Sequence, residues 1–207
     1  MESVGGRTGP VDQAGVVAPL ERPLAGILGD PATTFRLRFV AEKDLISGGI
    51  KWFEGKGVGP SHVDIVMPDG TYLGARNKGG VAVRPVDYIK PDDIVWERRY
   101  AIPMDPVPLT TMYAFANAQV GKGYDYSDIF SIALHANWNN PDKWICSELA
   151  LATSYAGDLF LLNVQAEFTH RIDPGRLHLS PLLRGRCYYS FVKGTQTQTA
   201  GLVSPAV

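Results

Sequence analysis

The stretch SHVDIVMPDGTYLGAR, residues 61–76, has the composition of two short β-strands separated by the turn residues PDG. A Pro-Asp pair suits a type I turn and glycine suits the left-handed position after it, so the sequence predicts a three-residue hairpin. In that register Val66 faces Tyr72, and Asp64 faces Gly74. Cross-strand partners share one face of a sheet. We therefore expect the Asp64 side chain to project over the space that Gly74 leaves empty.

Elements on either side of this hairpin follow from the periodicity of the apolar residues. The sequence predicts further strands over residues 35–41, 81–87, 94–102 and 187–192, and helices over residues 44–55, 109–121, 127–135 and 143–157. Most strands come first and most helices later. This order predicts the fold class α+β, with an antiparallel sheet packed against helices.

The domain organisation is predicted from composition. Residues 1–33 are rich in Gly and Pro, contain no aromatic residue and show no sustained period, which predicts an extended N-terminal arm. Residues 34–193 are then one domain, and residues 194–207 form a C-terminal tail. Both terminal segments are candidates for contacts with other protein subunits.

Charge and hydropathy exclude several classes of function. The chain has 207 residues, a formal net charge of −1 and no long Lys/Arg block, which argues against a nucleic-acid partner. Short basic pairs such as Arg36/Arg38 and Arg98/Arg99 are interpreted as solvated surface. No stretch is apolar enough for a transmembrane segment, and the start, MESVGGRTGP, does not resemble a secretory signal. We therefore expect synthesis in the cytoplasm without a signal peptide.

The segment WICSELA, residues 144–150, places Cys146 in the first turn of a predicted helix. Free backbone N–H groups and the positive end of the helix dipole favour a thiolate there. A thiolate needs a base, and His62 is the best candidate because it opens a strand at the edge of a loop. The alternatives are a buried structural thiol and a structural histidine. Cys187 lies in an apolar strand and is interpreted as a core residue.

Together, the segments SHVDIV and WICSELA, with YDY between them and a GVAVRP strand after the first, resemble the YiiX-like group of permuted NlpC-type proteins. The resemblance covers roughly residues 34–190, and the His strand precedes the Cys helix, as in the permuted group. It implies a circularly permuted papain-like fold and an acyl-enzyme thiol mechanism. It also implies that Cys146 and His62 are the reacting pair.

The third catalytic position departs from the family pattern. Related proteins often carry a carboxylate in a strand after the His strand, and the matching residue here is Gly74. Asp64 is the candidate for this catalytic position because the hairpin register brings its carboxylate over the same space, where it could orient His62. The alternative is an ion pair between Asp64 and Arg76 beside a weakened site. Tyr124, in YDY, is a candidate for contacting the substrate or the oxyanion, with ordinary packing as its alternative.

The leading functional hypothesis is a thiol hydrolase, a cysteine peptidase or amidase that cleaves a cell-wall peptide through an acyl-enzyme at Cys146. A second hypothesis is a structural subunit of a larger, virion-associated assembly such as a phage tail. The terminal arms, the absence of a secretory signal and Gly74 favour it. A third is a lipid acyltransferase or thioesterase. The four histidines and two cysteines show no metal-ligand spacing, so neither a metal nor another cofactor is expected.

Overall fold

The computed structural model of the chain describes residues 31–43, 59–125, 142–165, 168–169 and 172–194. Several predicted features lie outside the described residues: most of the N-terminal arm, the helices predicted over 44–55 and 127–135, and most of the C-terminal tail. Within the described part, Pro31–Thr33 form a short 3-10 helix, η1, and the carbonyl of Thr33 accepts a hydrogen bond from the Met104 backbone at 2.9 Å.

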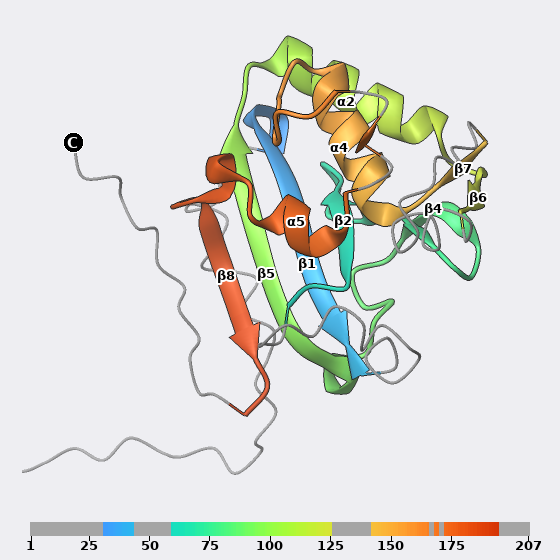
Figure 1. Ribbon diagram of the computed structural model, residues 1–207, viewed down its shortest axis with the longest axis vertical. Helices are drawn as coiled ribbons and strands as arrows, with labels where there is room; N and C mark the ends of the chain where they lie inside the picture. Colours follow the sequence, from blue (N-terminus) through green and yellow to red (C-terminus); the bar gives the residue numbers. More distant parts are fainter. Residues whose placement is uncertain (1–30, 44–58, 126–141, 166–167, 170–171, 195–207) are drawn as a thin grey trace, which may run out of the picture.

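A six-stranded sheet forms the centre of the molecule, in the order β4-β3-β2-β1-β5-β8 (Figure 1). Every neighbouring pair of strands in it is antiparallel. The mixed α+β class with an antiparallel sheet is therefore confirmed. The strands are β1 (Thr34–Glu42), β2 (His62–Val66), β3 (Tyr72–Arg76), β4 (Gly80–Arg84), β5 (Ile94–Pro103) and β8 (Cys187–Val192).

The hairpin that joins β2 to β3 has the predicted register. Val66 pairs with Tyr72, and Ile65 pairs with Leu73. The turn glycine, Gly70, has a positive φ of 87° and its N–H donates to the carbonyl of Met67 at 2.9 Å. The residues PDG thus place the β2 side chains opposite β3 as the sequence indicates.

Figure 1 shows three helices on one face of this sheet: α2 (Pro106–Ala118), α4 (Cys146–Ala156) and α5 (Pro174–His178). Two further 3-10 helices, η3 (Pro91–Asp93) and η5 (Pro181–Leu183), and a short parallel pair of strands, β6 (Gly123–Tyr124) and β7 (Lys143–Trp144), complete the described elements. The helix predicted over 143–157 begins only at Cys146, because Lys143 and Trp144 pair with β6. It ends as predicted, with Gly157 as its C-terminal cap.

The apolar core lies between the sheet and the helices. Side chains that alternate along β1 face the helices, and Phe35, Leu37 and Phe39 are each 0% exposed. The same core includes Met112 of α2 and Leu149 of α4. Burial of this kind, about 25 cal/mol for each Å² of apolar surface, is the main favourable contribution to folding.

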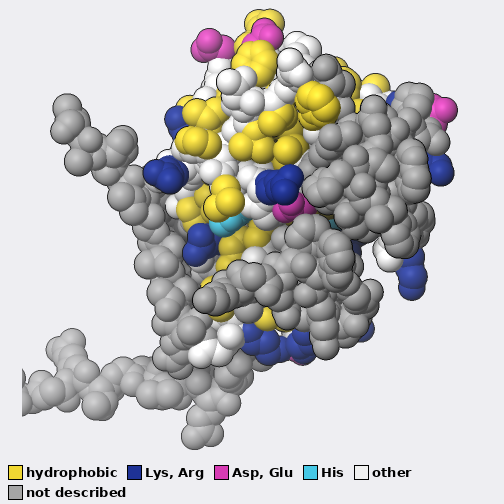
Figure 2. All heavy atoms as spheres, viewed as in Figure 1, with side chains coloured by type: hydrophobic (Ala, Val, Ile, Leu, Met, Phe, Trp, Pro, Cys, Tyr) yellow, Lys and Arg dark blue, Asp and Glu magenta, His cyan; other side chains and the backbone are white. Residues whose placement is uncertain are grey.

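Some apolar side chains are nevertheless exposed. Figure 2 shows hydrophobic side chains at the surface on the side that carries the helices, and the most exposed large ones of the described residues include Val107, Phe160 and Leu179. None of the described helices is long and apolar enough to cross a bilayer.

Candidate active site

Cys146 is the first residue of α4, directly after the extended residue Ile145. The N–H groups of a first helical turn have no partner within the helix, and Ile145 provides no side-chain cap for them. These groups and the helix dipole create a positive potential beside the sulfur. The thiol is only 5% exposed, so this potential acts with little screening by water.

His62 is the first residue of β2 and is 4% exposed. The structure brings it together with Cys146, because the thiol forms hydrogen bonds with the His62 ring and with the backbone of Val63. Burial alone would raise the pKa of the Cys146 thiol, but the charge and hydrogen bond of His62 outweigh burial and lower this pKa below its ordinary value. The pair is therefore arranged to hold a thiolate beside an imidazolium.

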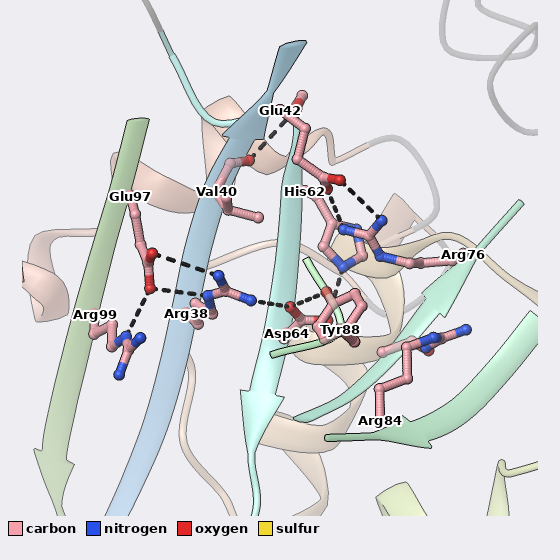
Figure 3. A network of polar contacts seen from close by, with 12 residues as sticks. Arg38, Val40, Glu42, His62, Asp64, Arg76, Arg84, Tyr88, Glu97 and Arg99 are labelled. Atoms are coloured by element: carbon pink, nitrogen blue, oxygen red, sulfur yellow. Dashed lines mark hydrogen bonds and ion pairs between the residues drawn. The ribbon is translucent and has the colours of Figure 1, made fainter. Parts of the chain in front are cut away.

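Asp64 lies two residues after His62 on the same face of β2. Its Oδ1 atom is 2.8 Å from Nε2 of His62. Because Nε2 contacts Asp64, Nδ1 is the ring nitrogen left for the thiol. The dashed contact between the two side chains is visible in Figure 3, which views the sheet from the face opposite the helices.

Gly74 of β3 creates the space that this contact needs. A Cβ atom at Gly74 would lie 2.5 Å from Oδ1 of Asp64 and 3.5 Å from Nε2 of His62. The carboxylate of Asp64 thus lies over the glycine, as the hairpin register predicts. The alternative partner, Arg76, forms its ion pair with Glu42 of β1 (Figure 3).

The second oxygen of Asp64 has its own partners. The hydroxyl of Tyr88 donates a hydrogen bond to Oδ2 over 2.6 Å, and Nη1 of Arg38 is 3.7 Å from the same atom. Asp64 is 0% exposed. Burial opposes its charge, but His62 and Arg38 outweigh burial and lower the pKa of Asp64 to about 2.

The charge of His62 follows from the same contacts. Burial disfavours the imidazolium, but the carboxylate of Asp64 and the thiolate of Cys146 outweigh burial and raise the pKa of His62 to about 9. At neutral pH the His62 imidazolium therefore lies between the Asp64 carboxylate and the Cys146 thiol, and its charge lowers the pKa of that thiol.

A wider ionic network supports Asp64 across three strands. Glu97 of β5 accepts a hydrogen bond from Nε of Arg38 at 2.9 Å and one from Nε of Arg99 at 2.7 Å. Arg38 is 1% exposed and Glu97 is 2% exposed. The interpretation of Arg38 as solvated surface is therefore wrong: its side chain lies on the polar face of β1, where Asp64 of β2 is its direct cross-strand partner.

Three residues of the site, Tyr88, Arg38 and Glu97, were not predicted from the sequence. A signal for Arg38 exists in the alternation of FRLRFVA, which separates its arginines from the apolar residues of the same strand. This alternation indicates a site residue only if it is also known that β1 pairs with β2. Tyr88 lies in the connection between β4 and η3, and no local pattern indicates where that connection runs.

The remaining candidates have different surroundings. Tyr124 of β6 pairs with Trp144 of β7, which lies two residues before the start of α4 at Cys146. The side chain of Tyr124 packs at the edge of the apolar core. Cys187 lies on β8, at the far edge of the sheet, and burial raises the pKa of its thiol. Among the described residues, no group of three or more His, Cys, Asp or Glu side chains is arranged to hold a metal ion.

Comparison with known proteins gives no assignment. No protein-family model matches the chain, and no curated protein matches it significantly.

Proposed function

We propose that this chain is a cysteine hydrolase with a circularly permuted papain-like fold, which cleaves an amide bond through an acyl-enzyme at Cys146. One observation carries the proposal: a thiol at a helix N-terminus, an imidazole and a carboxylate are in continuous contact, and all three are almost fully buried. Structural cysteines are usually buried in apolar surroundings that raise their pKa, whereas this thiol has a lowered pKa.

In the proposed reaction Cys146 and His62 each act once during formation of the acyl-enzyme and once during its hydrolysis. The Cys146 thiolate attacks the carbonyl carbon of the amide, and backbone N–H groups at the start of α4 stabilise the oxyanion that forms. The imidazolium of His62 donates its proton to the leaving amine, which departs and leaves a thioester. Neutral His62 then takes a proton from a water molecule, and the resulting hydroxide attacks the thioester. Collapse of this second intermediate releases the carboxylic acid and restores the thiolate and the imidazolium.

Asp64 serves this reaction as a positioning group. Its contact with Nε2 keeps Nδ1 directed at the sulfur and stabilises the imidazolium. In this role it replaces the family carboxylate whose place Gly74 occupies. The substrate class, an amide of a cell-wall peptide, comes from the resemblance of the SHVDIV and WICSELA segments to permuted NlpC-type proteins.

Digestion of purified cell-wall peptides tests the proposal. We expect the wild-type chain to generate new amine and carboxylate ends, detected by mass spectrometry, and Cys146→Ala to generate none. The same variant should keep the fold, since the change removes only one buried sulfur atom. Equal product from the wild type and Cys146→Ala would overturn the proposal. An absence of turnover together with an inert thiol would favour a structural subunit instead.

A further inference from the structure

Tyr88 is held at the site by contacts from several strands. It lies in the connection between β4 and η3, and its hydroxyl donates to Oδ2 of Asp64 over 2.6 Å. Its ring packs edge-on against Tyr72 with a centroid distance of 5.9 Å. Burial and the nearby charge of Asp64 raise the pKa of Tyr88 well above its ordinary value, so the hydroxyl keeps its proton and remains a donor.

Guanidinium groups also surround the ring of Tyr88. The centroid of this ring lies 4.7 Å from Cζ of Arg76, 5.7 Å from that of Arg38 and 5.8 Å from that of Arg84. These distances are within the range of cation–π attraction, about 6 Å. The three arginines come from β3, β1 and β4, so the ring is in contact with groups on three strands (Figure 3).

Each of these arginines is itself fixed. Arg76 pairs with Glu42, and Arg38 binds Glu97 with a distance of 2.9 Å. Arg84 donates to backbone carbonyls of the β3–β4 hairpin, at 2.8 Å for Gly74 and 3.0 Å for Gly80. Tyr88 is therefore held in a rigid frame, although its own connection has no regular secondary structure.

The hydroxyl of Tyr88 binds one oxygen of the Asp64 carboxylate and leaves the other oxygen for His62. With the hydroxyl present, Oδ2 is satisfied and Oδ1 is directed at His62. Without it, Oδ2 would be a buried, charged acceptor that lacks its shortest hydrogen bond, a costly state. A guanidinium donor, Nη1 of Arg38, lies 3.7 Å from the same oxygen. The carboxylate would then shift toward Arg38 and draw Oδ1 away from His62.

We propose that Tyr88 is a positioning residue, whose hydroxyl holds Asp64 in the rotamer that orients His62 toward Cys146; this inference rests on the function proposed above. The group acts through Asp64 and not on the substrate. Its effect should therefore appear in the titration of the Cys146–His62 pair. The charged or titratable groups that face this cluster come from six elements: Arg38 and Glu42 of β1, His62 and Asp64 of β2, Tyr72 and Arg76 of β3, Arg84 of β4, Glu97 and Arg99 of β5, and Cys146 of α4.

Tyr88→Phe tests this assignment because it removes the hydroxyl and keeps the ring. The rate of alkylation of Cys146 by iodoacetamide would be measured from pH 4 to 10 in a Cys187→Ser background. This substitution leaves Cys146 as the one cysteine of the chain. We expect the acid limb of the profile to move up by about one pH unit, which corresponds to a roughly tenfold slower reaction on that limb. Nitrogen NMR of His62 should show a lower imidazole pKa in the same variant.

Two further variants make the result specific. Tyr155→Phe is the matched control, because its hydroxyl donates to the carbonyl of Leu162 at 2.7 Å on the helix side of the sheet; its alkylation profile should equal that of the wild type. In an Asp64→Asn background, Tyr88→Phe should have no additional effect, since the two residues act in series.

The outcomes separate this inference from the proposed function. A wild-type profile with no lowered thiol pKa would contradict both. A lowered pKa in the wild type, with an identical profile in folded Tyr88→Phe, would overturn the positioning role alone. A Tyr88→Phe chain that does not fold would also overturn it, by assigning the hydroxyl to stability.

Discussion

Both faces of the sheet carry fully buried side chains, but the chemistry of the two faces differs. On the helix side, Phe35 and Leu37 of β1 are 0% exposed and belong to the apolar core cluster. On the other side, Arg38 of the same strand is 1% exposed, and it is surrounded by carboxylates and aromatic rings. Burial of ions is costly unless they are paired. The apolar face thus stabilises the fold, whereas the ionic face holds a defined arrangement of charges at a cost in stability.

Strand β2 shows the same contrast within five residues. Val63 and Ile65 belong to the apolar core, and His62 and Asp64 belong to the ionic face. A strand that alternates in this way attaches the imidazole and the carboxylate to an inner strand of the central sheet. Changes on the ionic face should therefore affect reactivity, and changes on the apolar face should affect stability alone.

The largest effect is expected for Asp64→Asn. The amide is nearly isosteric, but it stabilises the imidazolium less and favours the wrong tautomer of His62. We expect turnover of a peptide amide to fall by roughly 10²- to 10⁴-fold, with the fold intact by circular dichroism. Unchanged turnover would show that Asp64 does not orient His62.

A comparison of Glu97→Gln with Leu37→Ala tests the division between the faces. Loss of the Glu97 charge leaves Arg38 and Arg99 without their shared partner and should cost about 3–5 kcal/mol of unfolding free energy. Leu37→Ala should cost a similar amount, about 2–5 kcal/mol, by creating a cavity.

The two variants should differ in reactivity. In Glu97→Gln, Arg38 is free to move toward Asp64 and should lower the rate of Cys146 alkylation. Leu37→Ala should leave that rate unchanged. Denaturant titration and alkylation kinetics on the same samples measure both quantities. A loss of reactivity in Leu37→Ala equal to that in Glu97→Gln would remove the distinction between the faces.

Gly74→Ala should impair the site without unfolding the domain. The new Cβ would lie 2.5 Å from Oδ1 of Asp64, so the carboxylate must rotate away from His62. A displacement of about 1 Å in a reacting constellation can cost 10²-fold in rate, and we expect a loss of roughly 10- to 100-fold in turnover. Gly59→Ala is the control, because a Cβ there would meet nothing within 4 Å. Full activity of Gly74→Ala would contradict the role of the glycine.

The smallest effect concerns stability in acid. The pKa of Asp64 is lowered to about 2 in the folded chain, against about 3.9 when unfolded. A lowered carboxyl pKa contributes stability that is fully present above about pH 4 and is lost as the pH falls through 2. The difference in unfolding free energy between the wild type and Asp64→Asn, on the order of 2 kcal/mol at pH 5, should shrink toward zero at pH 2. A difference that stays constant with pH would mean that folding does not lower the pKa of Asp64.

Local rules were sufficient for the strands of the six-stranded sheet and for one half of the site. The PDG turn fixed the β2–β3 register, and that register alone predicted that Asp64 lies over Gly74. The position of Cys146 followed from the start of an amphipathic helix, although the short β7 strand before it was not foreseen.

The other half of the site depends on contacts between distant residues. Arg38 and Glu97 are separated by 59 positions, and they meet because β1 lies between β2 and β5. A pair of arginines in a sequence is usually solvated, and only the order of the strands shows that this one is buried. Tyr88 reaches Asp64 from a connection without regular structure, which periodicity cannot place.

The most direct test of the central claim compares the two cysteines of the chain. Burial raises the pKa of Cys187, whereas His62 lowers the pKa of Cys146. After brief treatment of the native protein with iodoacetamide at pH 6, mass spectrometry gives the rate of alkylation at each thiol. We expect Cys146 to react at least about tenfold faster than Cys187, because each unit of pKa difference changes the thiolate fraction tenfold. His62→Ala should abolish this preference. Reaction of Cys146 at the rate of Cys187 or more slowly would contradict an activated thiolate at this site.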